Sequence, residues 1–463
     1  MKRELICDIL KNPESYCDRE ITVGGWIKSL RDSKAFAFVS LSDGSAFTPM
    51  QVVLEREKLE NYEKLVRLNV GAAISVKGKI ILTPDAKQPF ELSAIEVCEE
   101  GASSPDYPLQ KKRHTVEYLR EIPHLRPRTN LLTAVFRIRS EAAYAIHSFF
   151  HQNNFVYVHT PILTTSDCEG AGEMFRVTTL DPKDPPLDDN GNVDYSKDFF
   201  GQKVSLTVSG QLEGETLAMA YGRIYTFGPT FRAENSFTAR HAAEFWMIEP
   251  EFAFADLNDD MELAWDMLRY VVGYVLSSCE SEIAFLNNFV DKGLKERLEK
   301  LCASECCKVT YTEAVEILKA SGEDFKYPVE WGCDLQTEHE RYLTEKHFGM
   351  PVFVIDYPKE IKSFYMRCND DGKTVAAMDL LVPGVGEIIG GSQREERLDI
   401  LLQRMEECEM PIEAYSRYID LRRYGGACHA GFGLGFERLI MYLTGVSNIR
   451  DVIPYPRTTG NCY

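Results

Sequence analysis

Short stretches that alternate hydrophobic and polar residues fill the first hundred positions of the chain. Five such stretches lie at residues 19–30, 35–45, 50–55, 72–82 and 90–99. Between the third and the fourth, residues 55–68 (EREKLENYEKLVRL) have helical spacing. Five short strands with one intervening helix are typical of a small closed barrel of the OB-fold type. We therefore predict an OB-fold β-barrel over residues 1–105.

The alternation is lost over residues 106–129, where Pro and basic residues accumulate, and we predict a hinge there. Beyond it, helical runs are mixed with strands, and hairpins outnumber regular β-α-β units. This pattern predicts an α+β domain over residues 130–463, built on an antiparallel β-sheet flanked by helices. A polar stretch at about residues 180–202 is expected to be an inserted loop.

Residues 231–254 (FRAENSFTARHAAEFWMIEPEFAF) form two apolar runs joined by a loop of small residues, which predicts a β-hairpin. With a period of two, one face of the second run is predicted to pack in the core: Trp246, Ile248, Phe252 and Phe254. The opposite face carries Phe245, Glu249 and Glu251. Arg232 and Glu234 share a face of the first run, where they suit either phosphate and amine binding or a cross-strand salt bridge.

Two further motifs are candidates for anion and metal binding. GFGLGFER (residues 431–438) places glycines before a helix and Arg438 near its start, which suits an anion, although tight packing of sheet and helix explains the glycines equally well. Asp379 and Glu387 flank the turn VPGVG, where two carboxylates on adjacent strands suit magnesium or are simply surface charges.

Composition narrows the class of protein. The 463 residues are 44% hydrophobic and 27% charged, with a net charge of −19, which argues against indiscriminate coating of nucleic acid. No apolar run approaches the ~20 residues that span a bilayer, and the N-terminus does not resemble a signal peptide. Thirteen cysteines without any CxxC pair fit a reducing compartment. We therefore expect a cytoplasmic protein.

Together these motifs resemble the class II aminoacyl-tRNA synthetases. FRAE with its loop resembles motif 2, GLGFER resembles motif 3, and the helix and strand that end at Pro161 resemble motif 1. The barrel resembles the anticodon-binding module of the aspartyl, asparaginyl and lysyl subgroup. Within it, VSGQLEGE, FTARHAAEFWMIEPE, GEIIGGSQREERLD and the polar insertion resemble the bacterial asparaginyl enzymes. The resemblance covers essentially the whole chain.

The resemblance implies an ATP site on the antiparallel sheet. Arg232 would bind the α-phosphate, Glu234 the adenine amine, and Phe245 would stack on the adenine. The other implied ligands are Arg240 and His241 for the β- and γ-phosphates, Arg438 for the γ-phosphate, and Asp379 and Glu387 for Mg²⁺. Arg232 and Arg438 would be the catalytic groups, because this chemistry needs positioning and charge neutralisation rather than a nucleophilic side chain.

The resemblance also implies the amino-acid site. Ser209, Gln211 and Glu169 would line it, with Gln211 and Glu169 near the ammonium group, while Arg394 would face the side-chain oxygen. Aspartyl enzymes have a Lys where this chain has Gly214, and an Asp at the position of Glu249. We therefore expect Glu249 to accept from the asparagine amide and to repel aspartate.

The implied partners are tRNA(Asn), asparagine and a second copy of the chain. Phe38 resembles the aromatic residue that stacks on the central anticodon base, with Arg31 and Gln51 beside it. The motif 1 region, residues 130–163, forms the homodimer interface in this family. The alternatives left open are a non-discriminating aspartyl-tRNA synthetase, an asparagine synthetase and a catalytically inactive RNA-binding paralogue.

Overall fold

The computed structural model describes residues 3–17, 19–86, 88–110, 112, 114–168 and 174–462. The chain divides into two compact units, Met1–Ala134 and Val135–Tyr463, each with its own core. The segment predicted as a hinge holds α3 (Val116–Glu121) and the 3₁₀ turn η2 (Arg126–Arg128). The predicted boundaries at residues 105 and 130 stay predictions.

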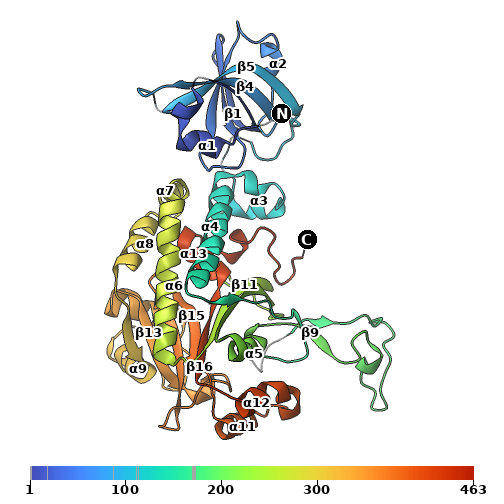
Figure 1. Ribbon diagram of the computed structural model, residues 1–463, viewed down its shortest axis with the longest axis vertical. Helices are drawn as coiled ribbons and strands as arrows, with labels where there is room; N and C mark the ends of the chain where they lie inside the picture. Colours follow the sequence, from blue (N-terminus) through green and yellow to red (C-terminus); the bar gives the residue numbers. More distant parts are fainter. Residues whose placement is uncertain are drawn as a thin grey trace. The chain divides into compact units, whose positions relative to one another are not determined.

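The first unit contains a closed five-stranded barrel, as predicted, with the strand order β1-β2-β3-β5-β4 (Figure 1). Its strands are β1 (Glu20–Asp32), β2 (Phe36–Ser42), β3 (Met50–Glu55), β4 (Ala73–Leu82) and β5 (Phe90–Gly101). Inward-facing Ile, Val and Leu side chains fill the barrel, and α1 (Ile6–Lys11) packs against this core through Ile6 and Ile9. The helix predicted over residues 55–68 is reduced to the single turn α2 (Tyr62–Leu65).

The second unit is built on an eight-stranded sheet with the order β12-β13-β14-β15-β16-β11-β10-β6. The central pairs, from β13 to β10, are antiparallel as predicted, whereas the edge strands β12 and β6 pair in parallel. The strands are β6 (Val156–Tyr157), β10 (Arg223–Phe231), β11 (Glu244–Ala253), β12 (Cys307–Thr310), β13 (Val352–Pro358), β14 (Thr374–Val382), β15 (Gly386–Gln393) and β16 (His429–Gly435). A small second sheet, in the order β7-β9-β8, contains β7 (Leu163–Thr164), β8 (Arg176–Val177) and β9 (Val204–Leu206).

Helices flank the large sheet, and α6 packs along β14, β15 and β16 (Figure 1). Asp256 caps α6, because its carboxylate accepts from the backbone N–H groups of Asn258 and Asp259. The helices are α4 (Asn130–Gln152), α5 (Gln211–Tyr221), α6 (Leu257–Ser278), α7 (Glu280–Phe289), α8 (Leu294–Ala303), α9 (Tyr311–Ala320), α10 (Thr337–Arg341), α11 (Leu398–Glu407), α12 (Ser416–Arg423) and α13 (Phe436–Thr444). Shorter helical turns are η1 (Pro13–Tyr16), η3 (Tyr195–Lys197), η4 (Tyr342–His347), η5 (Lys359–Ile361), η6 (Ile412–Tyr415) and η7 (Ile449–Asp451).

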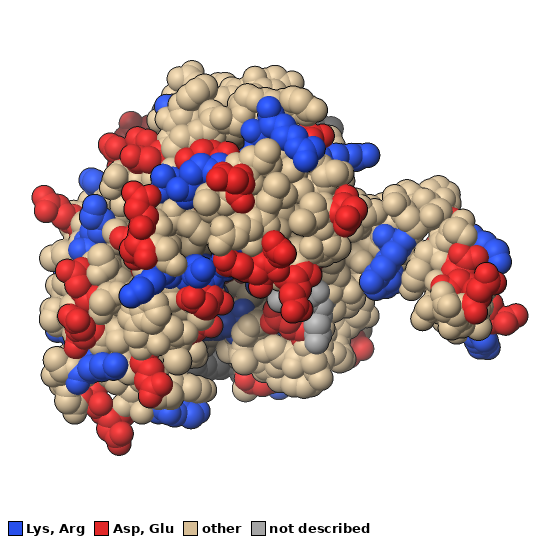
Figure 2. Space-filling model, turned by 90° about the horizontal axis from the view of Figure 1, so that it is seen from below, with Lys and Arg blue, Asp and Glu red and all other residues tan. Residues whose placement is uncertain are grey.

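The polar segment around residues 180–202 extends away from the sheet beyond β9 (Figure 1). It contains η3 and a short bridge between Leu187 and Val193, and it exposes the rings of Phe199 and Phe200, which meet edge to face. Figure 2 shows acidic and basic side chains together on this projecting segment. Among the described residues, no helix combines the length and apolar character that crossing a membrane requires.

Candidate active site

The hairpin of β10 and β11 is the centre of the site, and it corrects two predictions. Strand β10 ends at Phe231, so Arg232 and Glu234 lie in the connecting loop rather than on a strand. The predicted core face is also only half right. Ile248 and Phe252 are buried, but Trp246 is 39% exposed and Phe254, which has a positive φ at the end of the strand, is 85% exposed.

A cavity of about 240 Å³ lies over β11 and β16. All seven residues assigned to ATP by the resemblance line it: Arg232, Glu234, Arg240, His241, Phe245, Glu387 and Arg438. The guanidinium carbon of Arg232 lies 5.5 Å from the centre of the Phe245 ring, and His241 Nε2 lies 3.9 Å from a carboxylate oxygen of Glu234. The structure therefore brings three arginines, a histidine, an aromatic ring and two carboxylates from distant parts of the sequence to one cavity.

Two of the three glycines of GFGLGFER line this cavity. Gly431, Gly433 and Gly435 are spaced by two along β16, so they share one face of the strand. A Cβ on Gly433 would lie 2.9 Å from the Met247 methyl group, and one on Gly431 would lie 2.5 Å from the Glu251 carboxylate. The glycines therefore make room for side chains of β11, so tight packing within the sheet accounts for the glycines of this motif. Gly433 and Gly435 also line the cavity.

The loop between β10 and β11, residues 232–243, is held from one side by a segment much later in the chain. The backbone N–H of Ala243 donates to the Arg457 carbonyl at 2.8 Å, and the N–H of Ile449 donates to the Ala239 carbonyl at 2.8 Å. The Thr459 hydroxyl contacts the Glu234 carbonyl at 3.4 Å. We call residues 449–459 the clamp segment, and its Ile449, Thr458 and Thr459 line the cavity.

Asp379 and Glu387 converge on one point of the sheet, Gly390. A Cβ there would lie 3.3 Å from Asp379 Oδ1 and 3.2 Å from Glu387 Oε1, so a side chain at this position would occupy the space between the two carboxylates. Arg438 Nη1 donates to the Glu387 carbonyl at 2.9 Å and contacts its carboxylate at 3.3 Å. The predicted metal ligands and the predicted γ-phosphate ligand are therefore neighbours.

Two charged residues that sequence reasoning missed surround this pair. Lys362 Nζ donates to both oxygens of Asp379, at 3.1 and 2.9 Å, and burial opposes the charge on Lys362 while Asp379 raises its pKa. Glu340 Oε2 accepts from the backbone N–H of Glu387 at 3.1 Å. Burial, and then the charge on Glu387, raise the pKa of Glu340 to about 7. Among the described residues, no group of three or more His, Cys, Asp or Glu side chains is arranged to hold a metal.

The predicted amino-acid residues form a second, buried cluster beside the cavity. Glu249 is four residues along β11 from Phe245, about 13 Å at the usual rise of a strand. Its carboxylate accepts from the Ser209 hydroxyl, from the backbone N–H of Gly210 at 3.0 Å and from the Thr226 hydroxyl at 3.1 Å. A Cβ on Gly210 would lie 2.4 Å from Thr160 Oγ1, so this close approach requires glycine.

Arg394 and Glu251 form a buried, bidentate ion pair, and both side chains are at most 3% exposed. The third nitrogen of the guanidinium donates to the Ser392 hydroxyl at 2.8 Å. Burial opposes the charge on Arg394, but Glu251 raises its pKa above the ordinary value. Glu251, for which the sequence indicated no role, therefore fixes the position of the residue predicted to face the substrate side chain.

The remaining predicted residues are placed as follows. Gln211, the first residue of α5, is buried, and Glu169 lies outside the described residues. In the barrel, Arg31 pairs with Phe38 across β1 and β2, and Ser40 pairs with Gln51 across β2 and β3. Phe38 is half-buried, and Gln51 donates to Glu91 at 3.0 Å. Their roles in binding the anticodon stay predictions.

One further buried residue ties the motif regions together. Glu437 accepts from Arg139 on α4 at 2.7 Å and from the backbone N–H of Trp246 on β11 at 2.9 Å. A charged residue inside the apolar run GFERLIMYL was the only signal of it in the sequence.

Two family descriptions match the chain. Residues 115–459 match the family "tRNA synthetases class II (D, K and N)", and residues 21–97 match "OB-fold nucleic acid binding domain". The chain is 64% identical to the asparagine–tRNA ligase of Acetivibrio thermocellus over 458 residues, which cover 99% of each chain. It is 63% identical to that of Clostridium beijerinckii over 459 residues, again 99% of each chain.

Solved structures agree with this assignment. The asparaginyl-tRNA synthetase of Pyrococcus horikoshii complexed with asparaginyl-adenylate superimposes with a TM-score of 0.87, at 30% identity, over all of both chains. That of Entamoeba histolytica, also complexed with asparaginyl-adenylate, gives a TM-score of 0.81 at 26% identity and covers 96% of each chain.

Proposed function

Because this chain belongs to the class II tRNA synthetases of the D, K and N group, we propose that it attaches L-asparagine to tRNA(Asn). The reaction has two steps: asparagine and ATP give asparaginyl-adenylate and pyrophosphate, and the terminal hydroxyl of the tRNA then takes the acyl group and releases AMP. One observation carries the proposal. Strand β11 presents Phe245 to a cavity lined by Arg232 and Arg438, and presents Glu249 to the buried cluster beside it.

The chain's own groups account for the first step by positioning and by neutralising charge. The asparagine carboxylate attacks the α-phosphorus, and negative charge grows on the phosphate oxygens as pyrophosphate leaves. Arg232 lies at the Phe245 side of the cavity, where the α-phosphate would follow a stacked adenine. Arg438 lies at the Glu387 side, where it would hold the γ-phosphate, and Arg240 and His241 on the loop would hold the phosphates between.

The residues around Gly390 fit Mg²⁺. Magnesium takes oxygen ligands and is usually bound by one or two carboxylates together with substrate phosphates, so the two carboxylates of Asp379 and Glu387 suit it. When bound, the ion would neutralise charge on the phosphates. Lys362 already holds both oxygens of Asp379, so Glu387 is the carboxylate better placed to reach the ion directly.

Choice of asparagine rests on charge. Three donors hold the Glu249 carboxylate in place, and an ionised carboxylate can only accept hydrogen bonds. It can therefore accept from the amide N–H₂ of asparagine and would repel the carboxylate of aspartate. Arg394 supplies the donor for the side-chain oxygen. Aspartyl enzymes have a Lys at the position of Gly214. Here a Cβ would lie 3.5 Å from Ile224 Cδ1, and glycine contributes no positive charge to the pocket.

The barrel would bind the anticodon, with Phe38 stacking on a base and Arg31 and Gln51 beside it on neighbouring strands. We also propose a homodimer through residues 130–163, since Tyr144 on α4 and Tyr157 on β6 are more than half exposed. The reaction serves translation, so we place the protein in the cytoplasm.

Exchange of pyrophosphate into ATP, run with each of the twenty amino acids, tests the proposal. We expect exchange with asparagine alone, dependent on added Mg²⁺, and charging of tRNA(Asn). Exchange driven by aspartate would favour the non-discriminating aspartyl alternative, and no exchange at all would favour an RNA-binding protein. Asparagine-dependent exchange without Mg²⁺ would contradict the metal site.

A further inference from the structure

Glu215 on α5 is a fully buried carboxylate that none of the roles above uses. Each of its oxygens accepts two hydrogen bonds. Oε1 accepts from Gln211 Nε2 at 3.1 Å and from the Tyr418 hydroxyl at 3.0 Å. Oε2 accepts from Arg422 Nη2 and from His429 Nε2, each at 2.9 Å. All four lone-pair positions of the carboxylate are therefore filled.

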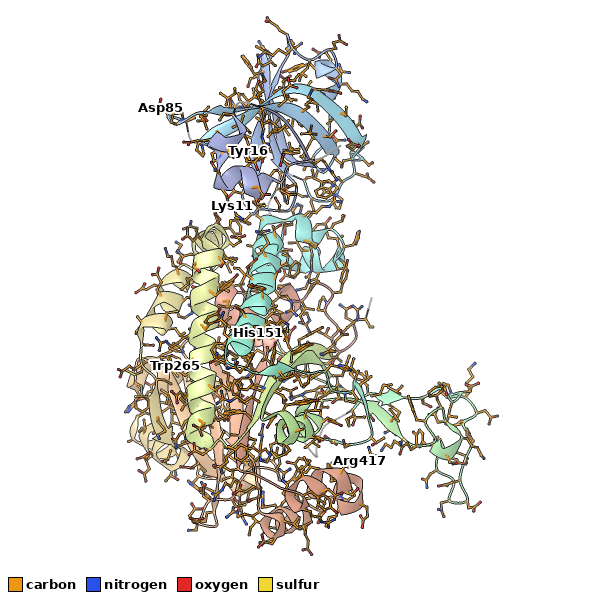
Figure 3. The ribbon with its side chains drawn as sticks, in the orientation of Figure 1. Lys11, Tyr16, Asp85, His151, Trp265 and Arg417 are labelled. Atoms are coloured by element: carbon orange, nitrogen blue, oxygen red, sulfur yellow. The ribbon has the colours of Figure 1, made fainter. Side chains whose placement is uncertain are left out.

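The donors come from three elements around the amino-acid site. Gln211 lies one turn before Glu215 on α5, His429 begins β16, and Tyr418 and Arg422 lie on α12. Helix α12, marked by Arg417 in Figure 3, contacts α5. Glu215 therefore joins the start of α5, which carries Gln211, to the sheet and to α12.

Glu215 stays ionised in spite of its burial. Burial alone would raise the pKa of this carboxyl, but the charge of Arg422 and the hydrogen bond from His429 hold the pKa below its ordinary value. An ionised carboxylate has no proton to donate, so only the N–H₂ end of the Gln211 amide can face it. The amide is planar, and its oxygen is then the end left to face the substrate.

We infer that Glu215 is a positioning residue of the amino-acid site, which holds the Gln211 carboxamide so that its oxygen, and not its N–H₂ group, meets the substrate ammonium. This inference rests on the proposed function. An ammonium group has three donors and no acceptor, so an N–H₂ group turned toward it would repel it.

Glu215→Gln tests the inference with little change of shape. Arg422 and His429 both donate to the Oε2 side, so the new N–H₂ group would take the Oε1 side, where the Tyr418 hydroxyl can turn to accept. Gln211 must then turn its own oxygen to this N–H₂ group and present N–H₂ to the substrate. Tyr418→Phe is the matched control, because it removes one donor to Glu215 and leaves the Gln211 contact in place.

The readout compares two ligands by calorimetry: a sulfamoyl analogue of asparaginyl-adenylate, and the same compound without its amino group. In Glu215→Gln we expect the dissociation constant of the first to rise roughly 10- to 100-fold, the worth of a hydrogen bond to a charged group. The second should change less than about 3-fold, and Tyr418→Phe should change neither by more than that. A merely structural loss would weaken both ligands together.

Equal weakening of the two compounds, or no weakening of either, would overturn the inference. If Glu215→Gln does not fold, the double variant Glu215→Gln with Arg422→Gln removes both charges of the buried pair, keeps an N–H₂ donor for the Oε2 side and carries the same prediction. Wild-type protein that fails to exchange pyrophosphate with asparagine would refute the proposed function instead. If the wild type exchanges pyrophosphate with asparagine but the variant binds both analogues more weakly to the same extent, only the inference about Glu215 is refuted.

Discussion

Glu249→Gln is the substitution that most directly tests how the chain chooses its amino acid. The Glu249 side chain is 6% exposed and is held by Ser209, Gly210 and Thr226. Glutamine has nearly the same shape and keeps one oxygen for Gly210 and Thr226, while the Ser209 hydroxyl can turn to accept from the new N–H₂ group. The change therefore removes one negative charge and little else.

The size of the effect follows from Coulomb's law. An aspartate carboxylate about 4 Å from Glu249 would be repelled by about 4 kcal/mol at an effective dielectric constant of about 20. That energy corresponds to a factor of about 10³. Glu249→Gln should therefore lower the ratio of kcat/KM for asparagine to that for aspartate by about 10³-fold. Most of the change should come from better use of aspartate.

Pyrophosphate exchange with each amino acid at saturating ATP measures this ratio. Glu244→Gln is the matched control, since Glu244 begins the same strand, is exposed, and loses the same charge. Its ratio should equal that of the wild type. If Glu249→Gln and Glu244→Gln give the same ratio of asparagine to aspartate, then Glu249 does not discriminate between them, and the charge argument is wrong.

Three further predictions concern the ATP loop, the carboxylate cluster and the barrel. A chain shortened after Pro456 loses the clamp contacts to Ala243 and Glu234, so its dissociation constant for ATP, measured by calorimetry, should rise at least about 10-fold. A chain lacking only Cys462 and Tyr463 is the control and should bind ATP as the wild type does. Equal affinities of the two shortened chains for ATP would contradict the role of the clamp segment. Glu340 has a pKa of about 7 in the folded protein, against an ordinary value of 4.5. Its carboxyl group therefore lowers the free energy of unfolding progressively as the pH rises from 4.5 to about 7. Glu340→Gln should therefore be more stable than the wild type at pH 8, by up to about 3 kcal/mol in denaturant unfolding, with the difference vanishing near pH 4.5; a difference independent of pH would refute this. Phe38→Ala should raise the KM for tRNA in the aminoacylation reaction roughly 10- to 100-fold and leave pyrophosphate exchange without tRNA unchanged. A loss of pyrophosphate exchange would mean that Phe38 does not act through the anticodon.

The barrel was predictable because its strands alternate with a period of two, and the antiparallel centre of the large sheet because hairpins outnumber β-α-β units in the sequence. The helix over residues 55–68 was not, since helical spacing is shared by any amphipathic turn and packing reduced it to Tyr62–Leu65. Trp246 and Phe254 were placed in the core by parity alone. Trp246 lies near the start of β11, and Phe254 follows its last residue with a positive φ, which ends the alternation of faces.

The residues proposed for ATP could be named from the sequence because they belong to local motifs, and the structure brings them to one cavity. The buried ion pairs could not be named. Glu251 pairs with Arg394, 143 residues away, and Glu215 pairs with Arg422, 207 residues away. Sequence alone gives only the hint that a charge inside an apolar run needs a partner, and it does not say which. Lys362 was overlooked for the same reason, since it follows η5 and nothing in the sequence shows that its partner is Asp379 on β14.

The clamp segment also has a consequence for the order in which the protein becomes active. Thr459 meets the loop of Glu234 across 225 positions of sequence. A ribosome making the chain at roughly 5–20 residues per second adds Thr459 more than about ten seconds after Glu234. During that interval the sheet can form, but the loop over residues 232–243 lacks its contacts with the clamp segment. The nascent chain therefore cannot complete the cavity, which Ile449, Thr458 and Thr459 help to line, until nearly all of the domain has been synthesised.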